Sequence, residues 1–375
     1  MMRSPHSFAI VVRRKSGALV VRERAMADAR KGVLSWPLVR GVAALVEALR
    51  LGSQALRFSM DHYEMDMEEQ ERRGAAPPST KKPGAKSDKP GVLNTLASWV
   101  LTLATLDTEP QPSAEMPKGK GKSPVTWVAL VIALAFFVAL PQATAFAASR
   151  LFHITPDIRS PGFQLLTGFF KLCIVIGYML VIRRVPEIYR VFQFHGAEHK
   201  TIATWEAEKE LTVANARGYS KLHPRCGTTF LVLVVLVSIL MFTAIGPLLP
   251  RFAVGGAALE NVLFFFMKLP FLPVVAAITY ELQRLSARFC LTGPLRLVLY
   301  PGFAVQLITT IEPDDSQLEV ALASLKATLW REQAEQGAAP VMPKDRLLES
   351  FGELMALPPY GNPPAALSSD EHVAP

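Results

Sequence analysis

Residues Thr228–Ile245 read TTFLVLVVLVSILMFTAI and contain no charged side chain. A helix needs about 20 apolar residues to cross the hydrocarbon core of a bilayer, so this stretch predicts a membrane span. Three further stretches are mainly apolar and similar in length: Val125–Ala148, Gly162–Ile182 and Asn261–Leu282. The sequence therefore predicts a mainly α-helical, polytopic membrane protein with about four transmembrane helices in residues 125–285.

The composition suits a membrane protein with polar extensions. Half of the 375 residues are hydrophobic, and the net charge is +8. Because the charge accompanies long apolar runs, we expect its partner to be anionic membrane lipid and not nucleic acid. The three cysteines, at positions 173, 226 and 290, favour a reducing compartment over a disulfide framework. A protein partner and a homo-oligomer stay open at this point.

Basic residues are shared unequally among the connections between the apolar stretches. The first connection carries Arg150 and Arg159, and the third carries only Arg251. The second carries a long series of basic side chains: Arg183, Arg184, Arg190, Lys200, Lys209, Arg217, Lys221 and Arg225. Since basic loops stay inside, both termini and the segment 183–227 are predicted to lie on the cytoplasmic side of the inner (plasma) membrane.

Residues 1–62 are predicted to form a cytoplasmic β-hairpin followed by an amphipathic helix. Two β-rich runs, Ser7–Arg14 and Ala18–Glu23, flank Lys15-Ser16-Gly17, a loop that suits a hairpin with a bulge. Ser35–Met60 then place polar residues on one helical face and apolar residues on much of the rest. Residues 63–124 are rich in Pro, Gly and charge, which predicts disordered linkers with a short interfacial helix at 92–106.

The chain after the last predicted span is expected to be cytoplasmic. In residues 286–335, Ser316 and Glu319 form a capping-box signature at the start of an amphipathic helix. The apolar stripe of this helix consists of leucines at helical spacing: Leu318, Leu322, Leu325 and Leu329. Residues 336–375 become rich in Pro and Ala and are predicted to be a disordered tail.

The connection between the second and third predicted spans contains three of the seven histidines and one of the three cysteines. His195 and His199 are four residues apart, so on a helix they project from one face, with Glu198 between them. This HGAEH sequence fits the H-x-x-E-H pattern of metalloproteases. His223 and Cys226 follow in HPRCG, and imidazole together with thiolate suits zinc. The predicted zinc ligands are therefore His195, His199, His223 and Cys226, with Glu198 as the catalytic base.

Two functions fit such a site, and an interpretation without metal stays open. Three protein ligands and a water would favour a metal-dependent hydrolase in which Glu198 activates the water. If His223 or Cys226 stays outside, Glu206 or Glu208 is the candidate third ligand. Four protein ligands would favour a non-enzymatic membrane scaffold with a structural zinc ion. Without metal, the histidines would cap helices and Cys226 would pack as a small hydrophobic residue.

Charged side chains inside the predicted spans suggest a third function. Lys171 lies near the middle of its span, where it either meets a buried partner or an anion, or extends its ammonium group to the membrane surface. Lys268 lies nearer the outer end, where extension to the surface is the better interpretation. With Glu281 at the cytoplasmic end of the last span, Lys171 would suit a small transporter. The absence of internal repeats and the few intramembrane charges argue against that function.

Four motifs resemble the YqhQ family of bacterial membrane proteins. They are FHGAEHKTI at Phe194–Ile202, HPRCGTTFL at His223–Leu231, ITYEL at Ile278–Leu282 and PGFAVQLITTIEPDDSQLEVALASL at Pro301–Leu325. The resemblance extends over most of the chain, apart from the linkers. It implies a multi-span membrane protein, and the family's label as a predicted metal-dependent enzyme implies a role for the site residues named above.

The start of the chain departs from this family. Its members usually carry a Gly-rich, apolar lead-in before the residues that match MMRSP, and this chain begins at Met1 without it. We expect the start codon to lie further upstream, because a missing first strand would leave the hairpin with an unpaired edge.

Overall fold

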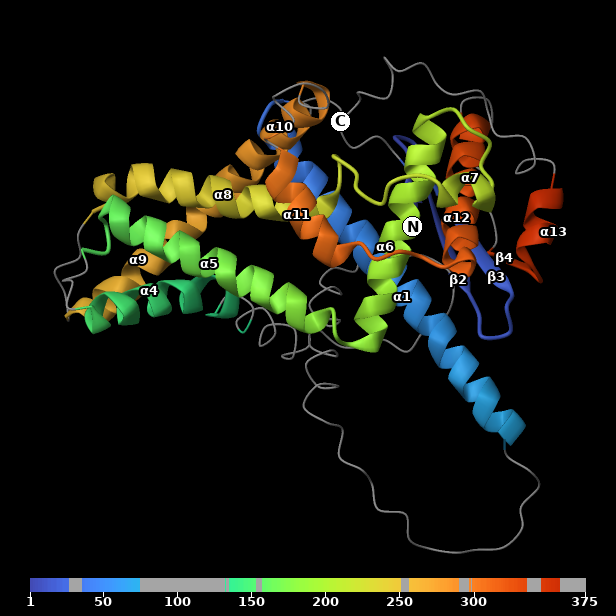
Figure 1. Cartoon of the computed structure of the whole chain (residues 1–375), viewed down its shortest axis with the longest axis horizontal. Helices are drawn as coiled ribbons and strands as arrows, with labels where there is room; N and C mark the ends of the chain where they lie inside the picture. Colours follow the sequence, from blue (N-terminus) through green and yellow to red (C-terminus); the bar gives the residue numbers. More distant parts are fainter. Residues whose placement is uncertain are drawn as a thin grey trace, which may run out of the picture.

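The structure, a computed structural model, describes residues 1–26, 36–74, 132, 135–152, 157–250, 256–289, 297, 299–335 and 345–357. The molecule is elongated and has two ends of different character (Figure 1). Long apolar helices run side by side at one end, which we call the membrane half. A small sheet and the helices that cover it form the other end, the sheet half.

Among the described residues, three helical segments are long and apolar enough to cross a membrane: Pro161–Ile182, Gly227–Leu248 and Leu259–Ser286. They coincide with the last three predicted spans and are consistent with a membrane location. Their elements are α5 (Pro161–Ile182), α8 (Gly227–Ile245), the 3₁₀ turn η3 (Gly246–Leu248), α9 (Ala257–Lys268), the 3₁₀ turn η4 (Leu269–Phe271) and α10 (Leu272–Phe289). The third segment changes from α9 to η4 at Pro270, because proline cannot donate the backbone hydrogen bond of a regular helix.

The first predicted span, Val125–Ala148, falls only partly within the described residues. Its second part forms a π-helical turn, η2 (Ala135–Ala139), followed by α4 (Leu140–Leu151). Helix α4 packs against α5 in the membrane half. The described residues therefore contain three helices that are long and apolar enough to cross a membrane, and four spans are not confirmed. The predicted interfacial helix at 92–106 lies outside the described residues.

Close contacts between the helices of the membrane half rely on glycine. A Cβ at Gly168 of α5 would overlap the side chain of Ile239 in α8. Gly302 of α11 (Tyr300–Thr309) meets Thr229 of α8 in the same way. Small residues are the usual means of close helix approach in membranes. Large apolar side chains such as Leu240 remain exposed on the outer faces of these helices, as a lipid environment requires.

The predicted N-terminal hairpin is confirmed and is part of a four-stranded antiparallel sheet. The strands, in spatial order, are β1 (Met2–Arg3), β2 (Ser7–Arg13), β3 (Leu19–Ala25) and β4 (Arg346–Leu348). Gly17 has φ +93° in the loop between β2 and β3, a conformation that favours glycine. Neither long strand of the hairpin has the fully open edge that we expected, because β1 pairs with β2 and β4 pairs with β3.

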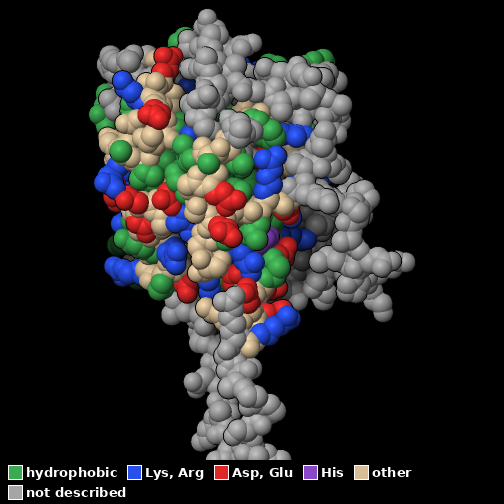
Figure 2. All heavy atoms as spheres, turned by 90° about the vertical axis from the view of Figure 1, so that its right-hand side faces the viewer, with side chains coloured by type: hydrophobic (Ala, Val, Ile, Leu, Met, Phe, Trp, Pro, Cys, Tyr) green, Lys and Arg blue, Asp and Glu red, His purple; other side chains and the backbone are tan. Residues whose placement is uncertain are grey.

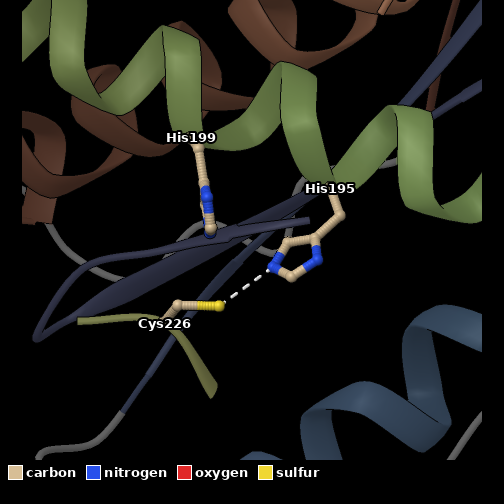
Figure 3. A group of neighbouring side chains, drawn as sticks. All are labelled: His195, His199 and Cys226. Atoms are coloured by element: carbon tan, nitrogen blue, oxygen red, sulfur yellow. Dashed lines mark hydrogen bonds between the residues drawn. The ribbon is translucent and has the colours of Figure 1, made fainter. Parts of the chain in front are cut away.

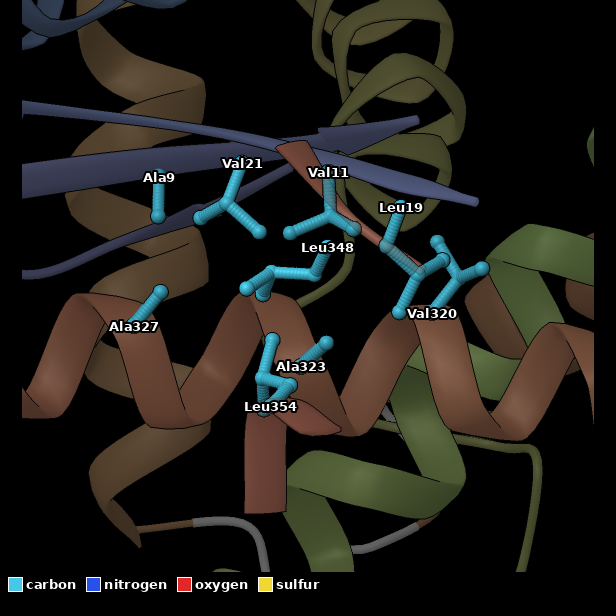
Figure 4. Close-up of a cluster of buried hydrophobic side chains, with 9 residues drawn as sticks. All are labelled: Ala9, Val11, Leu19, Val21, Val320, Ala323, Ala327, Leu348 and Leu354. Carbon is cyan, nitrogen blue, oxygen red and sulfur yellow. The ribbon is translucent and has the colours of Figure 1, made fainter. Parts of the chain in front are cut away.

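Both faces of this sheet are buried, which explains why β2 (SFAIVVR) has a continuous apolar run instead of alternating apolar and polar residues. One face packs against α1 (Val39–Gly74) through a cluster of buried side chains: Phe8, Ile10, Val20, Leu51 and Phe58. The other face packs against α12 (Asp315–Glu335) and the short helix α13 (Phe351–Ala356) (Figure 4). That second cluster contains Ala9, Val11, Leu19, Val21, Val320, Ala323, Ala327, Leu348 and Leu354.

Helix α12 lies at the centre of the sheet half, because its other side is buried as well. The predicted leucine stripe packs against α6 (Pro186–Glu206) and α7 (Val213–Arg217). This third cluster includes Ala197, Leu211, Ala216, Leu318, Leu322, Leu325 and Leu329. Helix α12 is therefore covered by the sheet on one side and by α6 and α7 on the other, so burial extends beyond the predicted leucine stripe to a second side of the helix.

Three boundaries differ from the predictions. Residues 345–357, expected in a disordered tail, form β4 and α13, because pairing with β3 and packing on α12 stabilise them. Helix α1 continues to Gly74 through residues expected to be linker. The capping box of α12 is formed by Asp314 and Gln317, not by Ser316 and Glu319. The Asp314 carboxylate accepts from the Gln317 N–H at 2.9 Å, and the Gln317 side chain accepts from the Asp314 N–H at 2.9 Å.

The outer surface of the sheet half carries acidic and basic side chains in close alternation (Figure 2). Ion pairs join parts of the chain that are far apart in sequence. Arg22 on β3 forms one with Asp345 before β4, with 2.6 Å between Nη2 and Oδ2. A mixed-charge surface of this kind is typical of a face exposed to water.

One glycine determines how α6 meets the chain between α11 and α12. A Cβ at Gly196 would overlap the carbonyl oxygen of Ile311. In the same contact, the N–H of Ile311 donates to the carbonyl of Phe192 at 3.0 Å. The backbone of residues 309–311 therefore lies directly on α6, and only glycine at position 196 permits this approach.

We expect Gly196→Ala to lower the free energy of unfolding by about 2 kcal/mol or more, because the added methyl group must displace a backbone carbonyl. Gly177→Ala on α5 is the matched control, since a Cβ there meets nothing within 4 Å. The control should be neutral or slightly stabilising, because alanine favours a helix by up to about 1 kcal/mol. Thermal unfolding of both variants in detergent measures the difference. Equal midpoints would contradict the close approach at Gly196.

Candidate metal centre

Helix α6 carries two histidines that project towards the start of α8. His195 and His199 lie one helical turn apart, and both side chains point towards Cys226 (Figure 3). Their ring centroids are 4.4 Å apart. The structure therefore places them as the H-x-x-E-H spacing predicts, on one face of a helix.

Cys226 comes from the turn that precedes α8 and is 4% exposed. It is the N-cap residue of α8, and its sulfur accepts a hydrogen bond from the N–H of Thr228 at 3.4 Å. The Sγ atom lies 3.1 Å from Nε2 of His195 and 3.1 Å from the hydroxyl of Thr228. Gln283 of α10 holds the backbone here by donating to the Cys226 carbonyl at 2.9 Å.

Both histidines are oriented by backbone carbonyls. Nδ1 of His195 donates to the carbonyl of Thr309 at 3.0 Å, and Nδ1 of His199 donates to the carbonyl of Lys221 at 2.6 Å. Because a carbonyl can only accept, the proton of each neutral ring lies on Nδ1, and Nε2 keeps its lone pair. A histidine that ligates a metal is usually held in this way through its other nitrogen.

His195, His199 and Cys226 can each offer one ligand atom, and these atoms all lie within 4.8 Å of one another. We call them the His-His-Cys group. Two imidazole nitrogens and one sulfur at this separation could hold a single metal ion. Among the described residues this is the one group of its kind.

The charge state of Cys226 also suits a metal ligand. Burial alone raises the pKa of its thiol, but hydrogen bonds and positive charge from His195 and His199 lower the pKa to about 5. For His195, burial lowers the pKa, while Cys226, the Thr309 carbonyl and the charge of Glu198 raise it by more. The thiol is therefore ionised at neutral pH and, without a metal, pairs with the Nε2–H of protonated His195. A metal ion would replace that proton and leave two neutral Nδ1–H rings beside a thiolate, which is the form that binds metals.

His223 is buried but lies outside the His-His-Cys group, unlike in the predicted four-ligand set. Its Nε2 is 3.2 Å from a carboxylate oxygen of Glu206, and its Nδ1 accepts from the N–H of Arg225 at 3.3 Å. Gln306 of α11 fixes the backbone of His223. The His223 N–H donates to Oε1 of Gln306 at 2.8 Å, and Nε2 of Gln306 donates to the His223 carbonyl at 2.7 Å. Both ring nitrogens are thus engaged in holding the turn.

The acidic side chains near the group divide into two kinds. Glu206 is held by His223 and by Arg225, whose Nη1 lies 3.0 Å from Oε1, and Glu208 is exposed at the end of α6. Neither joins the His-His-Cys group. Glu198 is partly buried, and its charge acts on His195. Within the described part of the chain Glu198 has no hydrogen-bond partner, so its carboxylate is available.

Glu281 is not part of the site. It forms an ion pair with Arg40 of α1, with 2.7 Å between Nε and Oε1, and thereby joins α1 to α10. The residues that sequence reasoning missed act mainly through their backbone. Carbonyls such as those of Thr309 and Lys221 leave no signal in a sequence, because every residue has one.

Comparisons with known proteins agree with the resemblance found in the sequence. Residues 36–331 match the family described as "Protein of unknown function (DUF1385)". The chain is 28% identical to "Uncharacterized protein YqhQ" of Bacillus subtilis (strain 168) over 306 residues, which cover 81% of this chain and 80% of the relative. No solved structure shows significant similarity to the chain. Neither description names a metal or an activity.

We expect the purified protein to carry about one transition-metal ion per chain, and His195→Ala or His199→Ala to lower this to background, because each removes one of three ligands. Mass spectrometry of the metal content measures the effect. His223→Gln is the matched control and should keep the metal, since its ring serves the turn. Loss of metal in His223→Gln, or retention in His195→Ala, would contradict the three-ligand group.

Proposed function

The chain belongs to the DUF1385 family, and we propose that it is a membrane-bound, zinc-dependent hydrolase whose ligands are His195, His199 and Cys226. The observation that carries this proposal is the orientation of the two histidines. Each Nδ1 is tied to a backbone carbonyl, so both Nε2 atoms face the same ionised sulfur. Histidines that ligate a metal are usually held in this way by a hydrogen bond from the other ring nitrogen, whereas histidines that only pack in a core do not need it.

The donor set supports zinc in preference to a hard cation. Magnesium and calcium prefer oxygen ligands, whereas two imidazoles and a thiolate are typical of zinc. Three protein ligands leave one position of a tetrahedral ion for water or substrate, as in catalytic zinc sites. The engagement of His223 with Glu206 and Arg225 supports three ligands over four.

When bound, zinc would supply a Lewis acid and would lower the pKa of a coordinated water. The chain's own residues would do the rest. Glu198 would accept the proton of the water at its free carboxylate. The carbonyls of Thr309 and Lys221 would keep the two histidines in the Nδ1–H tautomer. The Thr228 hydroxyl, 3.1 Å from Sγ, would stabilise the thiolate by donating to it.

A structural zinc site remains the second candidate, and a specific observation favours it. The His-His-Cys group lies where three elements meet: α6, the turn before α8 and the end of α11. An ion there would hold the sheet half and the membrane half together. In this function Glu198 would have no chemical role, so it is the residue that distinguishes the two candidates.

The sheet supports an even number of membrane crossings. Strand β3 pairs with β4 and packs on α12, so the chain before the first span and the chain after the last lie on the same side. The 183–227 segment joins them, since α6 packs against α12. Three candidate spans are odd in number, so we infer a fourth crossing within or near Val125–Ala148. The basic residues of the 183–227 segment support a cytoplasmic side for all of these parts, and hence both termini inside.

Cysteine accessibility in intact cells would test this topology. We expect Asp157→Cys to react with a membrane-impermeant maleimide, because it precedes α5 on the outer side. Glu210→Cys should react only after permeabilisation, because it lies between α6 and α7. The unsubstituted protein reports the background from its own cysteines. Labelling of Glu210→Cys in intact cells would overturn the inside location of the metal site.

Glu198→Gln separates the hydrolase from the scaffold. Glutamine keeps the shape of the side chain but cannot accept the proton, so activity should fall by about 10²–10⁴-fold while the metal stays bound. The readouts are metal content and rescue of a deletion phenotype. Glu187→Gln on the exposed start of the same helix is the matched control and should rescue fully.

A scaffold predicts a different pattern for the same set of variants. Glu198→Gln would then rescue as well as Glu187→Gln, whereas Cys226→Ser would lose both metal and rescue. That result would refute the hydrolase and retain the zinc site.

A further inference from the structure

A second polar site lies inside the membrane half, far from the metal centre. Lys171 of α5 and Lys268 of α9 both line one cavity of about 20 Å³, enough for one or two water molecules. Ser238 of α8 also lines it, twelve residues after Cys226, which is about 18 Å along the helix axis. The cavity and the His-His-Cys group are thus separate sites.

Lys268 is held in the cavity and does not extend to the membrane surface as the sequence suggested. It is 5% exposed, and its Nζ donates to Oε1 of Gln142 at 3.0 Å and to Oε1 of Gln164 at 2.9 Å. The rings of Phe264 and Phe242 lie 4.7 and 5.4 Å from Nζ. Neutral oxygens and aromatic faces therefore surround this ammonium group, and both stabilise a cation.

The two glutamines are themselves oriented by further bonds. Nε2 of Gln142 donates to the carbonyl of Asn261 at 2.9 Å, and Nε2 of Gln164 donates to the carbonyl of Ile158 at 2.5 Å. Their amide groups cannot turn without losing these bonds. Both Oε1 atoms are therefore fixed towards Lys268, and the site is organised before any ligand arrives.

Lys171 provides a second positive charge with a weak partner. Its Nζ has one hydrogen bond, to Oγ of Ser238 at 3.4 Å. In the described part of the chain, neither Lys171 nor Lys268 forms an ion pair with a carboxylate. A charge at this depth costs at least about 2.5–3.5 kcal/mol, and such residues usually pair or line a pathway for ions or substrates. Two ammonium groups at one cavity make this cost larger, since like charges repel.

We propose that the cavity binds a small monovalent anion, such as a halide ion, between the ammonium groups of Lys171 and Lys268. A halide is only slightly larger than a water molecule and so fits the volume, whereas a phosphate group does not. Its charge offsets the repulsion between the two lysines. The spare N–H donors of both lysines can contact it. The Ser238 hydroxyl donates its proton to the Val235 carbonyl at 2.7 Å, so its role is to accept from Lys171 and hold that ammonium group at the cavity.

Thermal unfolding in detergent tests the proposal with bromide as the probe. The wild-type protein is compared in sodium bromide and in sodium gluconate at equal ionic strength. A bound anion should raise the unfolding midpoint by about 3 °C or more in bromide. Lys171→Met should abolish the difference between the two salts. Lys209→Met, which removes an exposed lysine outside the membrane half, should keep it.

The proposal is overturned if the wild type responds equally to both salts, or if Lys171→Met retains the full bromide response. Lys268→Met gives the same test where Lys171→Met does not purify. A crystal structure of the wild-type protein soaked in bromide tests the same site without any substitution. An anomalous peak between the two Nζ atoms supports the site, and its absence at saturating bromide rejects it.

Discussion

The absence of a side chain at Gly196 is the constraint on which the rest of the structure depends. It lets α6 lie against the carbonyl of Ile311 while the Ile311 N–H bonds to Phe192. Two residues earlier, the carbonyl of Thr309 then reaches Nδ1 of His195. A few residues later, α12 begins and enters the space between α6 and the sheet. One backbone contact thus positions both the His-His-Cys group and the core of the sheet half.

The candidate metal centre lies where the membrane half meets the sheet half, and side-chain amides hold the backbone there. Gln283 of α10 fixes the carbonyl of Cys226, and Gln306 of α11 fixes both backbone groups of His223. The same device recurs deeper in the membrane half, where Gln142 and Gln164 surround Lys268. In each case a neutral amide satisfies a buried polar group without adding a charge that the apolar surroundings would penalise.

Much of this fold could be predicted from periodicity and composition. The elements that depend on pairing between distant parts of the chain could not. The three apolar spans, the hairpin and the leucine stripe of α12 follow from local pattern alone. Strand β4 does not, because Leu348 is ordered by Leu19, more than three hundred residues away. At the metal centre, the spacing of His195 and His199 placed both rings correctly. The sequence left open whether His223 or Cys226 joins the two histidines. Local pattern could not decide between them, because Gln306 holds the His223 backbone from a helix about 80 residues further along the chain.

The sheet is assembled from both ends of the chain, and this shapes how the protein must be made. The hairpin leaves the ribosome first, but α12 and β4, which cover one face and one edge of it, follow about 300 residues later. At about 5–20 residues per second, the hairpin waits roughly 15–60 s with apolar side chains uncovered. During that interval the candidate spans of the proposed topology would enter the bilayer. When β4 pairs with β3, the chain before the candidate spans is joined to the chain after them. The complete sheet can therefore form only after all of the candidate spans have been synthesised.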